Sequence, residues 1–135
     1  MSTVLRNELS KKNRYYISKH RMLELKHFCL QYEEWRQEYV RLTVLQGYGY
    51  GHIPGSNRPD PSSKIAMRAA ELDGYMKLVM KCCKEADDSI WTYIFEAVTC
   101  GLSYGTLSAR GIPCGKDYYY EKYRKFFWLL DKERG

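Results

Sequence analysis

The stretch that decides the fold is Trp91–Lys132, WTYIFEAVTCGLSYGTLSARGIPCGKDYYYEKYRKFFWLLDK. It indicates a helix that ends at Gly101, a short helix capped by Ser103, and a long basic and aromatic helix that starts near Gly115. Residues 110–112, Arg-Gly-Ile, form the turn between the last two helices, because glycine adopts positive φ at little steric cost. Two short helical elements that meet at a glycine turn, the second carrying positive charge, are typical of a helix-turn-helix.

Two longer helical segments precede this stretch, and each carries a continuous apolar seam. The first is expected from Ser18 to about Val44, with seam residues at spacings of three and four: Leu25, Phe28, Tyr32, Trp35, Tyr39 and Leu42. The second is expected from about Ser63 to Ala86, with the seam Ile65, Ala69, Leu72, Met76, Val79 and Cys83. These seams predict an antiparallel hairpin within one chain, and they equally fit a homodimer in which they pair between chains.

Three domains follow from these elements, and no β pattern interrupts them, so the expected fold is all-α. A basic N-terminal arm covers 1–16, the helical hairpin covers 17–86, and the helix-turn-helix unit covers 87–135 and packs on the hairpin. The hairpin contains a loop at 46–61 with four glycines and three prolines. Its candidate contact residues are Tyr48, Tyr50, His52 and Arg58. They either touch a nucleic acid or protein partner, or they pack on the chain's own helices.

The net charge of +6 is concentrated at the two ends of the chain. Residues 1–21 carry a charge of +5 and residues 101–135 carry +3, whereas residues 22–100 carry −2. Positive charge beside a potential recognition helix is expected of a protein that binds a polyanion such as double-stranded DNA. For the N-terminal arm taken alone, a solvated basic tail is an equal alternative.

The last helix contains most of the candidate DNA-binding side chains, since a helix-turn-helix lays this helix in the major groove. Its inward face is expected to hold Tyr119, Tyr123, Phe126 and Leu130, together with Ile112. The remaining candidates lie on its outward face, in the turn and in the arm: Lys116, Tyr118, Lys122, Arg124, Lys125, Ser103, Arg110, Lys11, Lys12 and Arg14. Lysine and arginine neutralise phosphates or bind guanine, and tyrosine hydroxyls bind phosphate. Cys114 and Asp117 are expected to cap this helix, and Glu121 to pair with Lys125.

Other classes of function find little support in the sequence. Five cysteines form no CxxC pair, which favours buried thiols in a reducing compartment over disulfides or a zinc site. The three histidines have no spaced acidic or cysteine partner, so we expect no catalytic residue, no metal and no cofactor. Neither a signal peptide nor a membrane span is apparent, and a soluble cytoplasmic protein is expected.

Several segments resemble a known family. GLSYGTLSARGIP (101–113) and KDYYYEKYRKFFWLL (116–130) resemble the C-terminal part of the RinA/ArpU-like regulators of phages of Gram-positive bacteria. That part is itself similar to region 4 of sigma-70-type factors, in which a GLSY-type helix start precedes the helix-turn-helix. LELKHFCLQYEEWRQEY (23–39) and DPSSKIAMRAAELDGYMKLV (60–79) resemble earlier parts of the same proteins. The resemblance covers most of the chain from Met22 onward.

The resemblance implies a DNA-binding regulator of late phage genes that acts in the host cytoplasm near a promoter and contacts host RNA polymerase. Two departures from sigma region 4 concern the groove contacts: the segment 103–112 is one residue shorter, and tyrosines at 118–120 replace small and basic residues. One alternative is a protein-interaction module that binds host RNA polymerase or inhibits a host defence nuclease. Another is a helical hairpin that oligomerises, such as a recognition subunit of a packaging motor.

Overall fold

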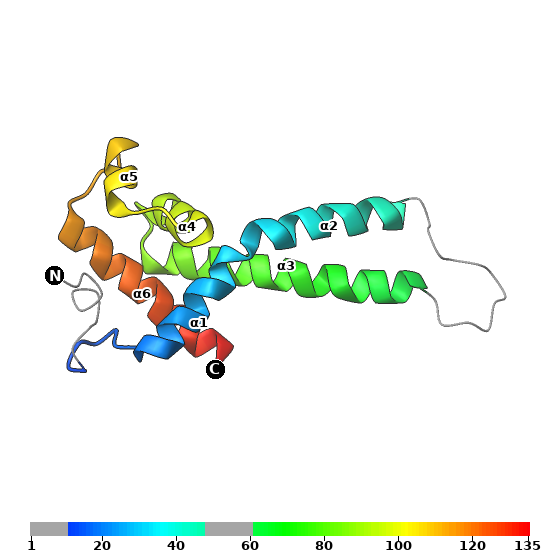
Figure 1. Ribbon diagram of the computed structural model, residues 1–135, viewed down its shortest axis with the longest axis horizontal. Helices are drawn as coiled ribbons and strands as arrows, with labels where there is room; N and C mark the ends of the chain where they lie inside the picture. The colour runs from blue at the N-terminus through cyan, green and yellow to red at the C-terminus, as the bar shows by residue number, and fades with distance from the viewer. Residues whose placement is uncertain (1–10, 48–60) are drawn as a thin grey trace. The chain divides into compact units, whose positions relative to one another are not determined.

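The computed structural model describes residues 11–47 and 61–135, and it gives side chains for 11–45 and 63–135. Within these ranges the protein is all-α, as the sequence predicts, and contains no strand (Figure 1). Its helices are α1 Lys19–Leu30, α2 Tyr32–Gly47, α3 Pro61–Ala86, α4 Trp91–Cys100, α5 Tyr104–Ala109 and α6 Lys116–Arg134. The loop contacts predicted for Tyr48, Tyr50, His52 and Arg58 lie outside the described residues.

The chain forms two compact units whose boundaries differ from the expected domains. One unit combines Met1–Leu30 with Leu78–Gly135, and the other is Gln31–Lys77. Helix α1, which the sequence assigned to a hairpin, therefore belongs to the unit that contains α4, α5 and α6. The second unit consists of α2 and the first part of α3.

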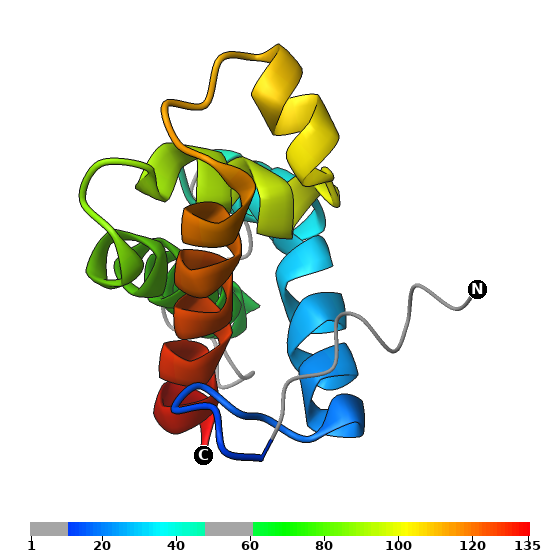
Figure 2. The ribbon, with the colours of Figure 1, turned by 90° about the vertical axis from the view of Figure 1, so that its left-hand side faces the viewer.

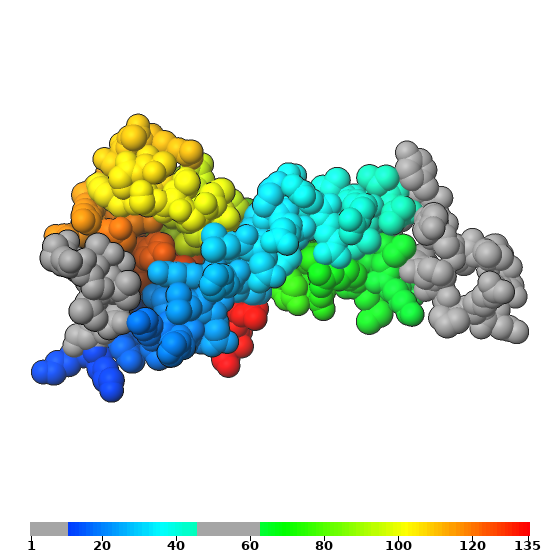
Figure 3. All heavy atoms as spheres, viewed as in Figure 1, coloured from blue at the N-terminus to red at the C-terminus, as the bar shows by residue number. Residues whose placement is uncertain are grey.

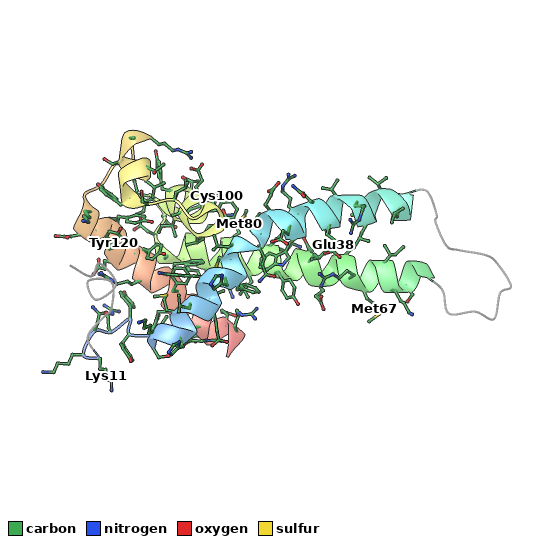
Figure 4. All side chains as sticks on the ribbon, viewed as in Figure 1. Lys11, Glu38, Met67, Met80, Cys100 and Tyr120 are labelled. Atoms are coloured by element: carbon green, nitrogen blue, oxygen red, sulfur yellow. The ribbon has the colours of Figure 1, made fainter. Side chains whose placement is uncertain are left out.

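In the unit Gln31–Lys77, α2 contacts the first part of α3, and four residues of the predicted seams are buried: Trp35, Leu42, Ala69 and Leu72. The Trp35 and Tyr75 rings lie 5.2 Å apart, and the Arg68 guanidinium donates to both Glu38 carboxylate oxygens at 2.9 and 3.0 Å. Glu38 follows Trp35 on α2, whereas its partner Arg68 precedes Tyr75 on α3. The two helices therefore run in opposite directions; Figure 4 labels Glu38 between them.

The other unit has its core where α1 packs against α4 and α6, while α4 also packs against α5 (Figure 2). Leu25, Ile94, Phe126 and Leu130 are fully buried in it. Two ion pairs connect α6 to its neighbours at the surface. Arg21 Nε lies 2.6 Å from an Asp131 oxygen, and Lys81 Nζ lies 3.1 Å from a Glu133 oxygen.

The single long helix expected from Ser18 to Val44 is wrong, because the chain breaks into α1 and α2 at Gln31. All of its seam residues are buried or half-buried, but they contribute to two different cores. Leu25 and Phe28 are buried in the unit that contains α4 and α6, whereas Trp35 and Leu42 are buried against α3. The break at Gln31 coincides with the boundary between the two units.

Two further boundaries have local causes. Helix α3 begins at Pro61, two residues before the approximate start at Ser63, because the fixed φ of proline suits the first helical position, which needs no N–H donor. At the N-terminal arm, the Asn13 side chain accepts the Tyr15 N–H at 2.8 Å and forms a tight turn. Tyr15 and Ile17 are then buried, with 5% and 9% of their surface exposed, so the end of the arm packs on the core.

Candidate nucleic-acid interface

The turn after α5 has the geometry that its glycine predicts. Gly111 has a φ of 89°, its N–H binds the Ser108 carbonyl at 3.0 Å, and the Ile112 N–H binds the Leu107 carbonyl at 3.1 Å. These two bonds form a Schellman motif, and the buried Leu107 and Ile112 side chains supply the apolar contact that accompanies it. Residues 107–112 therefore end α5 and turn the chain toward α6.

The connection between α5 and α6 spans residues 110–115, which is longer than the three- or four-residue turn of a compact helix-turn-helix. The Tyr104 hydroxyl donates to the Cys114 carbonyl at 2.7 Å and holds this connection against the start of α5. The expected cap by Cys114 is wrong, since Gly115 occupies the N-cap and offers no side-chain acceptor. Asp117 lies in the first turn of α6, where its negative charge interacts favourably with the positive end of the helix dipole.

The inward face of α6 is the one the sequence predicts, with one addition. Tyr119, Phe126 and Leu130 are buried, and Tyr123 is half-buried. Phe127 is equally buried, with 1% exposed, although it is not among the residues expected on this face. It follows Tyr123 by four residues, so helical spacing alone could have indicated it.

At the start of α6, Lys116 is exposed and Tyr118 points outward with 42% of its surface exposed. The Tyr118 hydroxyl donates to an Asp87 carboxylate oxygen at 2.6 Å, and this hydrogen bond raises the pKa of Tyr118. Burial raises the pKa of Asp87, but hydrogen bonds from Ser89, Tyr118 and Ile90 outweigh it, so the pKa lies below its usual value. The Tyr118 ring remains available to a ligand, while its hydroxyl already has an intramolecular partner.

Lys122 and Lys125, which are expected on or beside the outward face of α6, are both half-buried, as is the flanking Arg124. Lys122 Nζ lies 5.2 Å from the Tyr118 ring centroid and 3.8 Å from a Glu121 oxygen. Glu121 thus pairs with Lys122 instead of Lys125. The Lys122 ammonium therefore lies over the face of the Tyr118 ring, an arrangement in which cation and ring attract each other.

Arg110 and Ser103 also have partners within the fold. Arg110 lies at the end of α5, and its guanidinium donates to Glu96 at 2.9 Å, with about half of each side chain exposed. The Ser103 hydroxyl accepts the Thr106 N–H at 3.3 Å as the N-cap of α5, which confirms the predicted cap. Figure 3 shows the α5 region exposed on one face of the molecule.

The N-terminal cations Lys11, Lys12 and Arg14 are all exposed, and the adjacent Tyr15 packs this segment against the later half of α6. The Arg14 guanidinium lies 4.8 Å from the Tyr15 ring centroid, and that ring packs edge-on against Trp128 at 5.5 Å. Because a helix rises about 1.5 Å per residue, Trp128 lies roughly 18 Å along α6 from Lys116. The start of α6 and the N-terminal segment are therefore treated as two separate positive groups.

Two further cations, which are not among the predicted contact residues, lie in the last turn of α6. Lys132 Nζ lies 3.4 Å from the Trp128 ring centroid, and the Arg134 guanidinium lies 3.7 Å from the Phe28 ring. Lysine and arginine in the last turn of a helix interact favourably with the negative end of its dipole. The positions of Lys132 and Arg134 near the end of the expected helix could therefore have indicated them from the sequence.

The cysteines of the described residues are free thiols. Burial raises the pKa of Cys29 and of Cys82 to about 12, so both remain protonated and unreactive at neutral pH. Across 11–47 and 61–135, no three His, Cys, Asp or Glu side chains are arranged to hold a metal ion. None of the helices in these ranges combines the length and the apolar character needed to cross a membrane.

No protein-family model matches this sequence, and neither a curated protein nor a solved structure matches it.

Proposed function

We propose that this protein is a DNA-binding regulator of phage transcription, of the late-gene activator type, that contacts duplex DNA through α6 and the basic arm. The observation that carries the proposal is the Schellman turn at Gly111 joining α5 to a helix whose first turn exposes Lys116 and Tyr118. We also propose that α4, α5 and α6 form a helix-turn-helix similar to sigma region 4, and that the protein is a RinA/ArpU-like regulator. Lys11, Lys12 and Arg14 extend the phosphate contacts to the other end of α6.

Binding of fluorescent duplexes from the phage's own late-promoter region, measured over a range of salt concentrations, tests this function. We expect Lys116→Ala to weaken binding to all sequences and to reduce the slope of log K against log salt by about 1. Lys64→Ala is the matched control, because Lys64 is exposed on α3 in the other unit. Equal effects of the two substitutions, or no preference for any phage fragment, would contradict the proposal.

A second candidate is a module that binds host RNA polymerase or a host defence nuclease without DNA. It is favoured by exposed apolar side chains in the unit Gln31–Lys77, where Val40, Val44 and Met67 expose 48%, 50% and 71% of their surface. A measurement of binding between this protein and purified RNA polymerase, without DNA, distinguishes this candidate from the first. A Val40→Ser, Val44→Ser variant should then lose polymerase and retain DNA binding.

A further inference from the structure

A cavity of about 180 Å³ lies in the unit that contains α1 and α6. Met22 and Lys26 of α1 line it, as do Tyr120, Tyr123 and Arg124 of α6, and residues 102–104 complete it. Figure 4 labels Tyr120 on α6. All but one of the lining side chains are buried or half-buried, so the cavity is a recess between three segments and not a surface depression on one helix.

The cavity is positively charged. Lys26 and Arg124 both line it, whereas none of its lining residues is acidic. Within the described part of the chain, neither of these cations takes part in an ion pair. By contrast, Arg21 on the same helix as Lys26 is neutralised by Asp131 at 2.6 Å. Two half-buried cations without a counter-charge favour an anionic ligand.

The walls of the cavity are aromatic. The Tyr119 ring lies 5.0 Å from Tyr120, 5.4 Å from Tyr104 and 5.7 Å from Tyr123, measured between centroids. Such a cluster offers ring edges and faces to an aromatic ligand. Burial raises the pKa of Tyr119 and of Tyr123, so these hydroxyls stay protonated at neutral pH and can donate hydrogen bonds.

The volume limits the ligand to one ring. A cavity of roughly 150 Å³ accommodates benzene, whereas pockets for drug-sized ligands start at roughly 300 Å³. We propose that this cavity binds a monocyclic aromatic carboxylate, with its ring among the tyrosines and its carboxylate between Lys26 and Arg124. The site does not depend on DNA binding, because it is built from residues that face one another inside a single unit.

Isothermal titration of the full-length protein with benzoate tests this site. We expect saturable binding of one benzoate per chain, at least tenfold weaker binding of the neutral benzamide, and at least tenfold weaker binding of acetate. Arg124→Gln should weaken benzoate binding about tenfold, because it removes a charged hydrogen-bond donor. Lys125→Gln is the matched control: it removes the same charge from the next residue of α6, which does not line the cavity.

The proposal is overturned if benzamide or acetate binds as well as benzoate, if binding does not saturate, or if Lys125→Gln weakens it as much as Arg124→Gln. If Arg124→Gln does not fold, Met22→Phe decides the matter. This substitution places a rigid ring in the wall of the cavity and keeps both cations, so benzoate binding should weaken while the helical circular dichroism spectrum is retained. Benzoate binding unaffected by Met22→Phe places the ligand elsewhere.

Discussion

At the scale of single residues, Asp87 is the side chain with the most hydrogen bonds beside the proposed interface. Its carboxylate accepts the Ile90 N–H at 3.0 Å, the Ser89 hydroxyl at 2.6 Å and the Tyr118 hydroxyl at 2.6 Å. It therefore satisfies backbone donors before α4 and joins the start of α6 to that corner. One carboxylate connects two elements that are distant in sequence.

We expect Asp87→Asn to lower the free energy of unfolding at pH 7 by about 1–2 kcal/mol, the scale of a lost cap and a charged hydrogen bond. The pKa of Asp87 is lower in the folded protein than its unfolded value of about 3.9. Its stabilisation is therefore present above about pH 4 and is lost as the pH falls through the folded pKa. The difference between wild type and variant should be smaller at pH 3 than at pH 7 in urea unfolding experiments.

Asp88→Asn is the control for this prediction, because Asp88 is the exposed neighbour of Asp87 and carries the same charge. It should change stability by less than about 0.5 kcal/mol at either pH. If both substitutions have the same effect, net charge rather than the Asp87 hydrogen bonds stabilises this corner.

At the scale of elements, two glycines end the helices on either side of residue 103. Gly101 and Gly111 have φ values of 71° and 89°, a region that other residues enter only at a cost. At Gly111 an added Cβ would meet nothing within 4 Å, so the backbone conformation alone requires glycine there. The geometry of the α5–α6 connection therefore depends on this one position.

Gly111→Ala should lower the free energy of unfolding by about 1–2 kcal/mol, because alanine must adopt the left-handed conformation. Gly74→Ala in α3 is the matched control, and it should raise the free energy of unfolding instead of lowering it. A Cβ at Gly74 also meets nothing within 4 Å, and alanine in a helix is favoured over glycine by about 1 kcal/mol. Thermal unfolding followed by circular dichroism measures both, and a loss of stability in Gly74→Ala would contradict the reasoning.

At the scale of the whole molecule, the two units differ in how much apolar surface they bury. The unit Gln31–Lys77 has only four buried side chains among its described residues: Trp35, Leu42, Ala69 and Leu72. The larger unit contains the remaining buried residues of the described ranges, among them three from α4 and four from α6: Ile94, Ala97, Val98, Tyr119, Phe126, Phe127 and Leu130. The smaller unit should therefore open more readily than the larger one.

Hydrogen exchange followed by mass spectrometry tests this difference. In the wild type, amides of α2 should exchange faster than those of α4 and α6. Trp35→Ala removes the largest buried side chain of the smaller unit, at about 3–5 kcal/mol, and should abolish protection in α2 while α4 and α6 keep theirs. Val40→Ala is the control, since Val40 is 48% exposed. Equal loss of protection in all helices after Trp35→Ala would indicate that the units unfold together.

Local patterns in the sequence were sufficient for the helices and for most of their buried faces. The seams of α2 and α3, the cap at Ser103 and the helix ends at Gly101 and Gly111 could all be predicted, because spacing, capping and glycine conformation act over a few residues. The outward position of Tyr118 followed from the same periodicity.

What the sequence by itself determined is the all-α class, the extent of the short helices and the side of α6 that is buried. Only the tertiary structure decided that the first seam breaks at Gln31, that Tyr15 packs on Trp128, and that Lys122 lies along an aromatic ring. The physical reason is range. Helical periodicity states that a face is apolar, but which distant segment covers it depends on the packing of residues that only the folded chain brings together.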